Sequence, residues 1–203
     1  MQYPAYFDDI PVFTVYDPLA GFLGATVGGV IEYRYLDAVK LTGHSCPTVA
    51  SAYWITVKAM KALYKDEMPC RGGIRVDFAD NRNSGVTGVT ANVVQLLTGA
   101  AGDDGFKGLS GIFFRNTLMT FGASGRYQIR FAQREAHKHV DASVDLSRLP
   151  QSLELRQLMQ RCLSGAADFS ENQRFRELWQ LRVRQVILDH GEDPEVFRVV
   201  LGR

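Results

Sequence analysis

The stretch at residues 41–64 constrains the fold more than any other part of the chain. It opens with a polar turn that reads Gly-His-Ser-Cys, and Pro47 follows directly. Proline favours the first position of a helix, because its missing N–H is not needed there and its φ is preset. From Pro47 to about Tyr64, apolar side chains recur at helical spacing. The pattern therefore predicts a long core helix with Cys46 at its N-cap.

His44 and Cys46 form the candidate site. They lie two residues apart, so both side chains can face one point if the backbone between them is extended or turned. Free N–H groups and the positive end of the helix dipole favour a thiolate at Cys46. A thiolate beside an imidazole is typical of a metal site, or of a nucleophile with the histidine as its base. For an isolated His-x-Cys pair, a buried cysteine and a turn histidine are the favoured alternative.

The bulk composition is that of an ordinary globular protein. A chain of 203 residues suits one domain, or one domain with a helical appendage. Hydrophobic residues make up 46% of it and charged residues 22%, which are common values. The formal net charge of +1 gives no electrostatic reason to expect nucleic acid or an anionic membrane as a partner.

The cysteines and the N-terminus predict a cytoplasmic location. The three cysteines are Cys46, Cys70 and Cys162, an odd and sparse set that fits a reducing compartment. The sequence has no CxxC pair, so a conventional zinc finger is excluded on ligand count. The first residues are acidic and do not resemble a signal peptide, and no run of about 18 apolar residues predicts a membrane span.

The remaining pattern predicts an α+β fold. Strand patterns occur at residues 30–35, 74–79, 111–121 and 126–133. Helical patterns occur at residues 47–64, 87–97, 151–165 and 170–189, with short helices from Asp17-Pro18 and Asp193-Pro194. We expect a mixed or antiparallel sheet to pack against the two core helices, 47–64 and 87–97. Residues 111–121 and 126–133 are expected to pair as an antiparallel hairpin.

The chain divides into two predicted parts. Residues 1–145 form the α+β core domain, and residues 146–203 form a C-terminal helical extension that packs on the core or on a dimer mate. Ser170 and Gln173 have the spacing of a capping box at the start of the later helix. Its apolar stripe is most simply a core or dimer contact. The stripe consists of Phe175, Leu178, Trp179, Val183 and Ile187.

Two motifs resemble the FmdE family, the proteins similar to the FmdE component of formylmethanofuran dehydrogenase. The stretch at residues 43–47 is similar to the family's Gly-His-x-Cys-Pro, which opens a long helix. Residues 95–99 read Gln-Leu-Leu-Thr-Gly and resemble the Gln-x-x-Thr-Gly end of the family's second helix. The resemblance covers roughly residues 35–135. It implies the core fold, and a metal or catalytic site at His44 and Cys46.

The chain departs from the family pattern at several positions. Typical members carry a cysteine just before the second helix and another directly after Thr-Gly, where Val89 and Ala100 stand here. Some members also end in a treble-clef zinc finger, where this chain has two amphipathic helices. These departures argue against a role in a formylmethanofuran dehydrogenase complex, and they favour a bacterial-type offshoot with its own role.

The resemblance makes a transition-metal site the favoured interpretation of His44 and Cys46. A nitrogen and a sulfur ligand suit zinc best, with nickel or iron as alternatives. Two ligands alone hold no ion tightly, so the others must come from elsewhere in the fold, from a dimer mate or from substrate. Asp80, Glu32 and Cys70 are the candidates within the chain, although an inert thiol is favoured for Cys70.

Weaker candidates for ligand-binding and metal-binding residues lie elsewhere in the chain. Lys107, in a Gly-rich loop at residues 102–108, could reach an anionic ligand, and Arg115 is a similar cofactor-binding candidate in the strand predicted after it. For the loop at residues 102–108, a surface loop without a ligand is the favoured interpretation. His137 and His139 alternate as metal ligands on a strand would, but an exposed polar edge is favoured there.

These observations predict an FmdE-like cytoplasmic protein, and a small-molecule ligand is compatible with it. It is expected to act as an enzyme or accessory factor in metal-dependent one-carbon or redox metabolism. One alternative is a non-catalytic carrier of a metal or small molecule. The other is a cysteine-nucleophile enzyme that uses Cys46 with His44 as base. The apolar helix faces predict a homodimer, and neither nucleic acid nor a membrane is expected as a partner.

Overall fold

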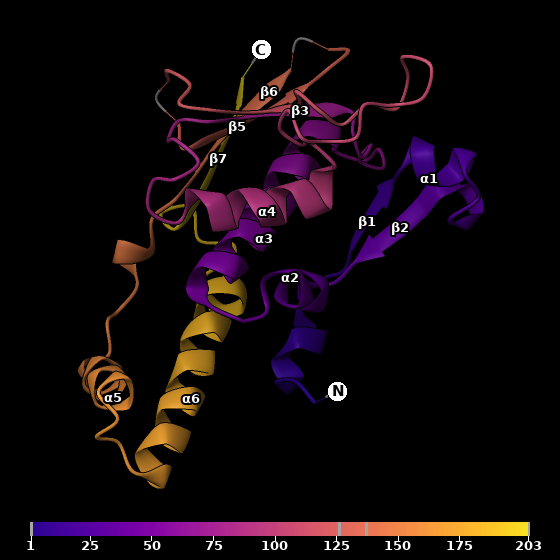
Figure 1. Ribbon diagram of the computed structural model, residues 1–203. Coiled ribbons are helices and arrows are strands. Elements are labelled where there is room, and N and C mark those ends of the chain that lie inside the picture. The colour runs from indigo at the N-terminus through magenta and orange to yellow at the C-terminus, as the bar shows by residue number, and fades with distance from the viewer. Residues whose placement is uncertain (1, 126, 137, 203) are drawn as a thin grey trace.

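The computed structural model describes residues 2–125, 127–136 and 138–202 (Figure 1). The α-helices are α1 (Pro18–Phe22), α2 (Tyr35–Thr42), α3 (Pro47–Tyr64), α4 (Thr87–Thr98), α5 (Leu153–Leu163) and α6 (Phe169–Arg184). The strands are β1 (Phe13–Tyr16), β2 (Val30–Tyr33), β3 (Ile74–Phe78), β4 (Met119–Phe121), β5 (Ile129–Gln133), β6 (His139–Val144) and β7 (Phe197–Gly202). A π-helical segment, Gln185–Asp189, continues α6.

Two sheets organise the chain. The larger sheet has the strand order β4-β3-β5-β6-β7, with β3 and β4 parallel and the other neighbours antiparallel. The smaller sheet is the antiparallel pair β1 and β2, which extends with α1 as an arm to one side (Figure 1). The fold is therefore α+β, as predicted.

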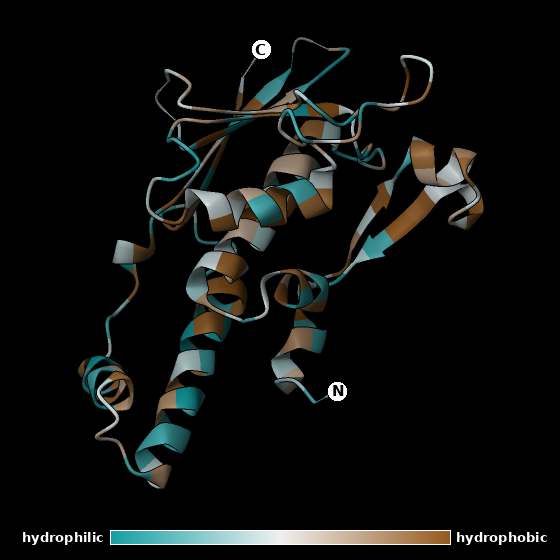
Figure 2. Cartoon of the chain, in the orientation of Figure 1, coloured by the Kyte–Doolittle hydropathy of each residue, from teal (hydrophilic) through white to brown (hydrophobic). Residues whose placement is uncertain are grey.

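Helix α3 is the centre of the core. It packs against β6 and β7 of the larger sheet, and against α2 and α4 on other sides (Figure 1). Its small residues Ala50, Ala52 and Ala59 are almost completely buried and let these neighbours approach closely. A helix that is buried on most sides needs apolar side chains there, and most of the buried residues of α3 are apolar. By contrast, Figure 2 shows that much of α6 is hydrophilic, because α6 covers the core along one side only.

The two predicted core helices are confirmed. Helix α3 begins at Pro47 and ends at Tyr64, and α4 ends at Thr98, where Gly99 adopts the left-handed conformation with φ +72°. The predicted start of α1 is also confirmed, since the Asp17 carboxylate accepts hydrogen bonds from the amides of Leu19 and Ala20. Within the described residues, none of the helices has the length and apolarity needed to cross a membrane.

The predicted hairpin is wrong. Strand β4 pairs parallel to β3 along one edge, and β5 pairs antiparallel along the other edge of β3, so β4 and β5 are not neighbours. Of residues 111–121 only Met119–Phe121 form a strand, because Phe113 and Thr117 have positive φ values that interrupt an extended chain. The segment at residues 30–35 is also reassigned: β2 pairs with β1 in the arm, and Tyr35 begins α2.

The C-terminal segment differs from its prediction in two places. The predicted last helix from Asp193-Pro194 is a turn followed by β7, which pairs with β6 and completes the larger sheet. Helix α6 begins with Asp168 and Glu171 as its capping box, in place of Ser170 and Gln173. The division at residues 145 and 146 stays a prediction, and the later part contributes β7 to the sheet of the earlier part.

Candidate functional site

The candidate site lies in the connection between α2 and α3. Gly43 ends α2 in the left-handed conformation, with φ +77°, and its N–H donates to the Val39 carbonyl. Cys46 is extended, with φ −146° and ψ 167°, and caps α3 directly before Pro47. Residues 44–46 therefore link the glycine that ends one helix to the proline that begins the next.

Cys46 is the N-cap that the motif predicts. Its sulfur is half-buried and accepts a hydrogen bond from the Val49 amide at 3.5 Å. The side chain also lies at the positive end of an 18-residue helix. Both features place positive charge density on the side of the sulfur that faces the helix.

His44 is exposed, and a backbone carbonyl orients its ring. The Nδ1 atom lies 2.9 Å from the carbonyl oxygen of Thr42. A carbonyl oxygen only accepts hydrogen bonds, so Nδ1 carries the hydrogen and the neutral ring keeps its lone pair on Nε2. Metal-binding histidines are oriented in the same way, with one nitrogen on a carbonyl and the other on the metal.

Helix α6 holds the residue between the two candidates. The indole nitrogen of Trp179 donates to the Ser45 carbonyl at 2.9 Å, and the Gln180 amide approaches the same oxygen at 3.5 Å. The Ser45 hydroxyl lies 2.9 Å from the phenol oxygen of Tyr35, which is fully buried. The sequence pattern placed Trp179 only in an apolar stripe. Its indole N–H was the available signal, because a partly buried indole needs an acceptor.

The other predicted metal ligands lie apart from this pair. Cys70 follows α3 and forms an isolated bridge with Tyr16, while Asp80 is exposed after β3 and Glu32 is exposed in the arm. Across the part of the chain that the structure describes, no three His, Cys, Asp or Glu side chains are grouped closely enough to hold one metal ion. Burial raises the pKa of the Cys70 thiol, which makes its thiolate less available.

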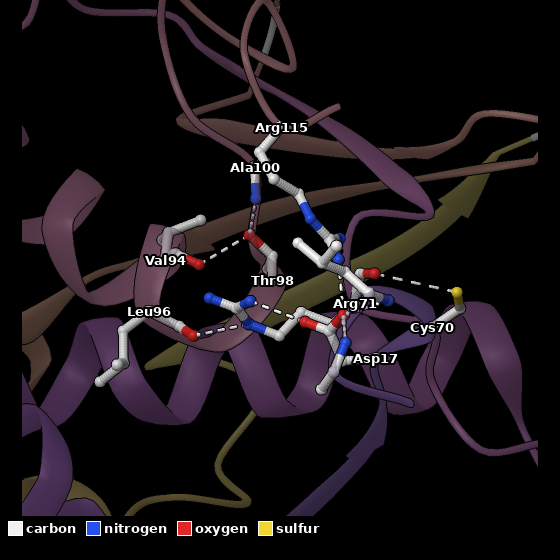
Figure 3. Close-up of polar contacts among 10 residues, drawn as sticks. Asp17, Cys70, Arg71, Val94, Leu96, Thr98, Ala100 and Arg115 are labelled. Atoms are coloured by element: carbon white, nitrogen blue, oxygen red, sulfur yellow. Dashed lines mark hydrogen bonds and ion pairs between the residues drawn. The ribbon is translucent and has the colours of Figure 1, made fainter. Parts of the chain in front are cut away.

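Arg115 takes part in a buried ionic cluster with Asp17 and Arg71 (Figure 3). The Asp17 carboxylate lies 2.7 Å from the Arg115 guanidinium and 2.8 Å from that of Arg71. Arg71 also donates to the Leu96 carbonyl at 3.2 Å. Burial alone would raise the pKa of Asp17, but hydrogen bonds from Arg71 and from the Ala20 amide, with the charges of both arginines, hold it below its usual value.

The cluster joins four segments of the fold. It connects the arm, the turn before β3, the end of α4 and the loop that carries Arg115. Gly72 is needed beside it, because a Cβ there would overlap the Arg115 guanidinium. Burial lowers the pKa of Arg115, and its Nε has no acceptor among the described residues. Arg115 therefore cross-links the chain, and its predicted role with a ligand stays untested.

The remaining candidates lie on other surfaces. Lys107 is exposed in the loop before Arg115. His139 is half-buried in β6, where its register partner is Gly202 of β7, so it is not on a free edge. His137 lies outside the described residues.

Two hollows of about 370 Å³ each border the motif loop, and Trp179 lines both of them. One is lined by Pro47 together with residues of α5 and α6, and the other by Ser45 together with residues of the N-terminal segment and α6. Both volumes lie in the range of about 300–1,000 Å³ that is usual for small-molecule sites. The motif loop therefore has space for a small molecule next to it.

Comparison with known families decides the chain's membership. A family model described as FmdE, molybdenum formylmethanofuran dehydrogenase operon, matches residues 41–193. The chain belongs to the FmdE family. The match begins at the motif loop and continues through α5 and α6, beyond the range of the resemblance seen in the sequence. A comparison with curated proteins found no match.

At the two positions where typical family members carry cysteines, this FmdE-family protein has Val89 and Ala100. Val89 stands in the first turn of α4 and is half-buried. Ala100 follows Gly99 directly and is completely buried, with its amide donating to the Thr98 hydroxyl. At these positions the chain offers apolar side chains in place of thiols.

Proposed function

We propose that this FmdE-family protein binds a divalent transition metal through His44 Nε2 and Cys46 Sγ, with zinc favoured over nickel or iron. The observation that carries the proposal is the hydrogen bond between His44 Nδ1 and the Thr42 carbonyl, which leaves the lone pair of Nε2 available to a metal, two residues from a thiol. An imidazole nitrogen with a thiolate sulfur is a donor set that suits these metals. The remaining ligands would come from a second copy of the chain or from substrate.

The proposed role is that of an enzyme or accessory factor in metal-dependent one-carbon or redox metabolism, located in the cytoplasm. Family membership supports the link to one-carbon metabolism. The three free cysteines, none of them paired in a disulfide, fit a reducing compartment. The hollows beside Ser45 and Pro47 supply room for a substrate near the metal.

Metal content tests this proposal directly. Untagged protein should carry a near-stoichiometric transition metal by elemental analysis, and both His44→Ala and Cys46→Ser should lose most of it. Cys162→Ser is the matched control, because it removes a half-buried thiol from α5, away from the motif loop. Full metal content in both site variants would rule the proposal out.

A metal carrier is the second candidate, and the exposure of His44 favours it. A carrier needs an open site from which the metal can leave, and an exposed ring at one ligand position allows that. The rate at which bound metal exchanges with a chelator distinguishes the two roles. Exchange within seconds indicates delivery, whereas metal that stays bound for hours indicates a resident cofactor.

A thiol enzyme is the third candidate. The Thr42 carbonyl orients His44 so that Nε2 could act as a base, and the Val49 amide already contacts the Cys46 sulfur. This mechanism predicts that a mild alkylating agent modifies Cys46 well before Cys70 and Cys162 near neutral pH. Equal rates at all three cysteines would exclude it.

A further inference from the structure

The groove between α5 and α6 has a composition that the metal proposal does not explain. It is the hollow of about 370 Å³ that Pro47 borders, and the two helices lie side by side along it (Figure 1). Its apolar wall includes Leu155 and Met159 from α5 and Leu178 and Trp179 from α6. An open groove with such a wall can hold an aliphatic chain or a ring.

The charged residues of the groove have one sign. Arg156 and Arg182 line it, and none of its lining residues is acidic. Arg182 is partly buried and donates to the Pro150 carbonyl at 2.7 Å, but no carboxylate of the described residues lies within 4.0 Å of it. Burial lowers the pKa of Arg182. A partly buried guanidinium without a counter-charge favours an anion beside it.

The start of α5 adds to this positive field. Ser152 caps the helix by accepting from the Leu155 amide at 3.1 Å, and both residues line the groove. The positive end of the helix dipole therefore lies at the same end as Arg156. Glu154 also belongs to this first turn, but its carboxylate is bound to Arg174, and neither residue lines the groove.

We propose that the groove between α5 and α6 binds a small amphipathic carboxylate. Its carboxylate group lies near Arg156 and Arg182, where a guanidinium can hold it with two parallel hydrogen bonds. Its apolar body lies against Trp179, Leu155 and Met159. This inference goes beyond the proposed function, because binding in the groove requires neither a metal nor the Cys46 thiol.

Octanoate is the probe, and tryptophan fluorescence reports on it. The chain has two tryptophans, and Trp54 is buried with its indole on the Gly191 carbonyl, so Trp179 is the one that a ligand can reach. Octanoate should change the emission in a saturable way. Octanol and octylammonium, of equal chain length, should bind at least about tenfold more weakly, because they lack the charge that the arginines recognise.

Arg156→Gln is the main variant, because Arg156 is exposed and, among the described residues, its one hydrogen-bond partner is the nearby Gln151. We expect it to weaken octanoate binding about tenfold. Arg184→Gln changes the charge equally on the outer side of α6, where Arg184 pairs with Asp189, and should leave binding unchanged. Cys46→Ser should also bind octanoate normally, which separates this inference from the metal site.

Three results would overturn the inference. They are the absence of saturable binding, equal binding of octanol and octanoate, and equal weakening by Arg156→Gln and Arg184→Gln. Isothermal calorimetry on the unmodified protein gives the same comparison without relying on Trp179. If the unmodified protein carries its full metal content but does not bind octanoate, the groove proposal is wrong and the metal proposal is unaffected.

Discussion

The indole nitrogen of Trp179 lies 2.9 Å from the carbonyl oxygen of Ser45, a residue 134 positions earlier in the chain. This hydrogen bond ties α6 to the loop that carries His44 and Cys46. Trp179 also lines both of the hollows that border the loop. The C-terminal helices therefore help to set the geometry of the candidate site.

Trp179→Phe tests this connection. The substitution keeps an aromatic ring but removes the donor to Ser45, so we expect the free energy of unfolding to fall by about 1 kcal/mol. The loop should also become more accessible, and Cys46 should react faster with an alkylating agent. Trp54→Phe is the control, because it removes the same kind of bond at Gly191. It should cost at least as much stability, because Trp54 is almost completely buried, without changing the rate at Cys46, and equal acceleration by both variants would contradict the role of Trp179.

Asp17→Asn should be strongly destabilising. It leaves the buried guanidinium of Arg115 without its counter-charge, for which losses of about 3–5 kcal/mol are typical. Asp141→Asn is the matched control, since Asp141 pairs with Arg130 at a site where both side chains are about one-third exposed. That pair should contribute only about 0–1 kcal/mol. Urea unfolding of the two variants measures both effects, and similar losses would contradict the structural role of the cluster.

Because of the same cluster, we expect the free energy of unfolding to depend on pH in the acid range. The pKa of Asp17 is lower in the folded protein than its usual value of 3.8, so its contribution to stability is complete above that value. The contribution is lost as the pH falls below 3.8 and the carboxylate takes up a proton. The difference in unfolding free energy between the unmodified protein and Asp17→Asn should therefore shrink in this range. A difference that stays constant through acid pH would refute this account.

Local patterns predicted the helices, and long-range pairing limited the prediction of the strands. Helix α3 was predictable because Pro47 and the apolar spacing are local signals. The neighbours of β3 were not, because β4 and β5 are consecutive strands in the sequence yet lie on opposite edges of β3. The positive φ values at Phe113 and Thr117, which confine β4 to three residues, carry no glycine signal. Strand β7 was missed because Asp193-Pro194 has the pattern of a helix start.

The candidate site could likewise be predicted only in part from local patterns. His44 and Cys46 were predictable, because the motif and its helix are contiguous in the sequence. The Thr42 carbonyl and the Val49 amide that contact them are local, but Trp179, which holds Ser45 between them, comes from a distant segment, and only its indole N–H indicated that it needs a partner. The side chains of this candidate site can be proposed from one sequence, but the contact between Trp179 and Ser45 depends on the tertiary fold.

Alkaline pH should destabilise the protein through the half-buried Tyr6 and the buried Tyr35 near the motif loop. Burial raises the pKa of Tyr6 from 10.0 to about 12, and it also raises the pKa of Tyr35. The folded state therefore favours the neutral phenols, and their contribution to stability is complete below pH 10 and lost as the pH rises through about 12. Urea unfolding across this range should show the decline.

Tyr35→Phe isolates one of these groups. At neutral pH it should cost about 1 kcal/mol, because the hydrogen bond with the Ser45 hydroxyl is lost. Its alkaline decline should be shallower than that of the unmodified protein. Tyr3→Phe removes an exposed phenol and should leave the decline as it is. An unchanged slope in Tyr35→Phe would show that its ionisation does not limit stability.

The arm supplies one exposed apolar surface for the predicted homodimer. Phe22, Leu23 and Val27 lie close together in sequence at its tip and are 65%, 62% and 97% exposed. Such a cluster on a projecting element favours contact with a second copy. We expect a dimer by light scattering at micromolar concentration, and Val27→Asp should weaken it at least about tenfold. Phe169→Asp is the control, because Phe169 is 84% exposed at the start of α6, on another element. A monomer mass for the unmodified chain, or equal dissociation by both variants, would show that the arm does not mediate dimerisation.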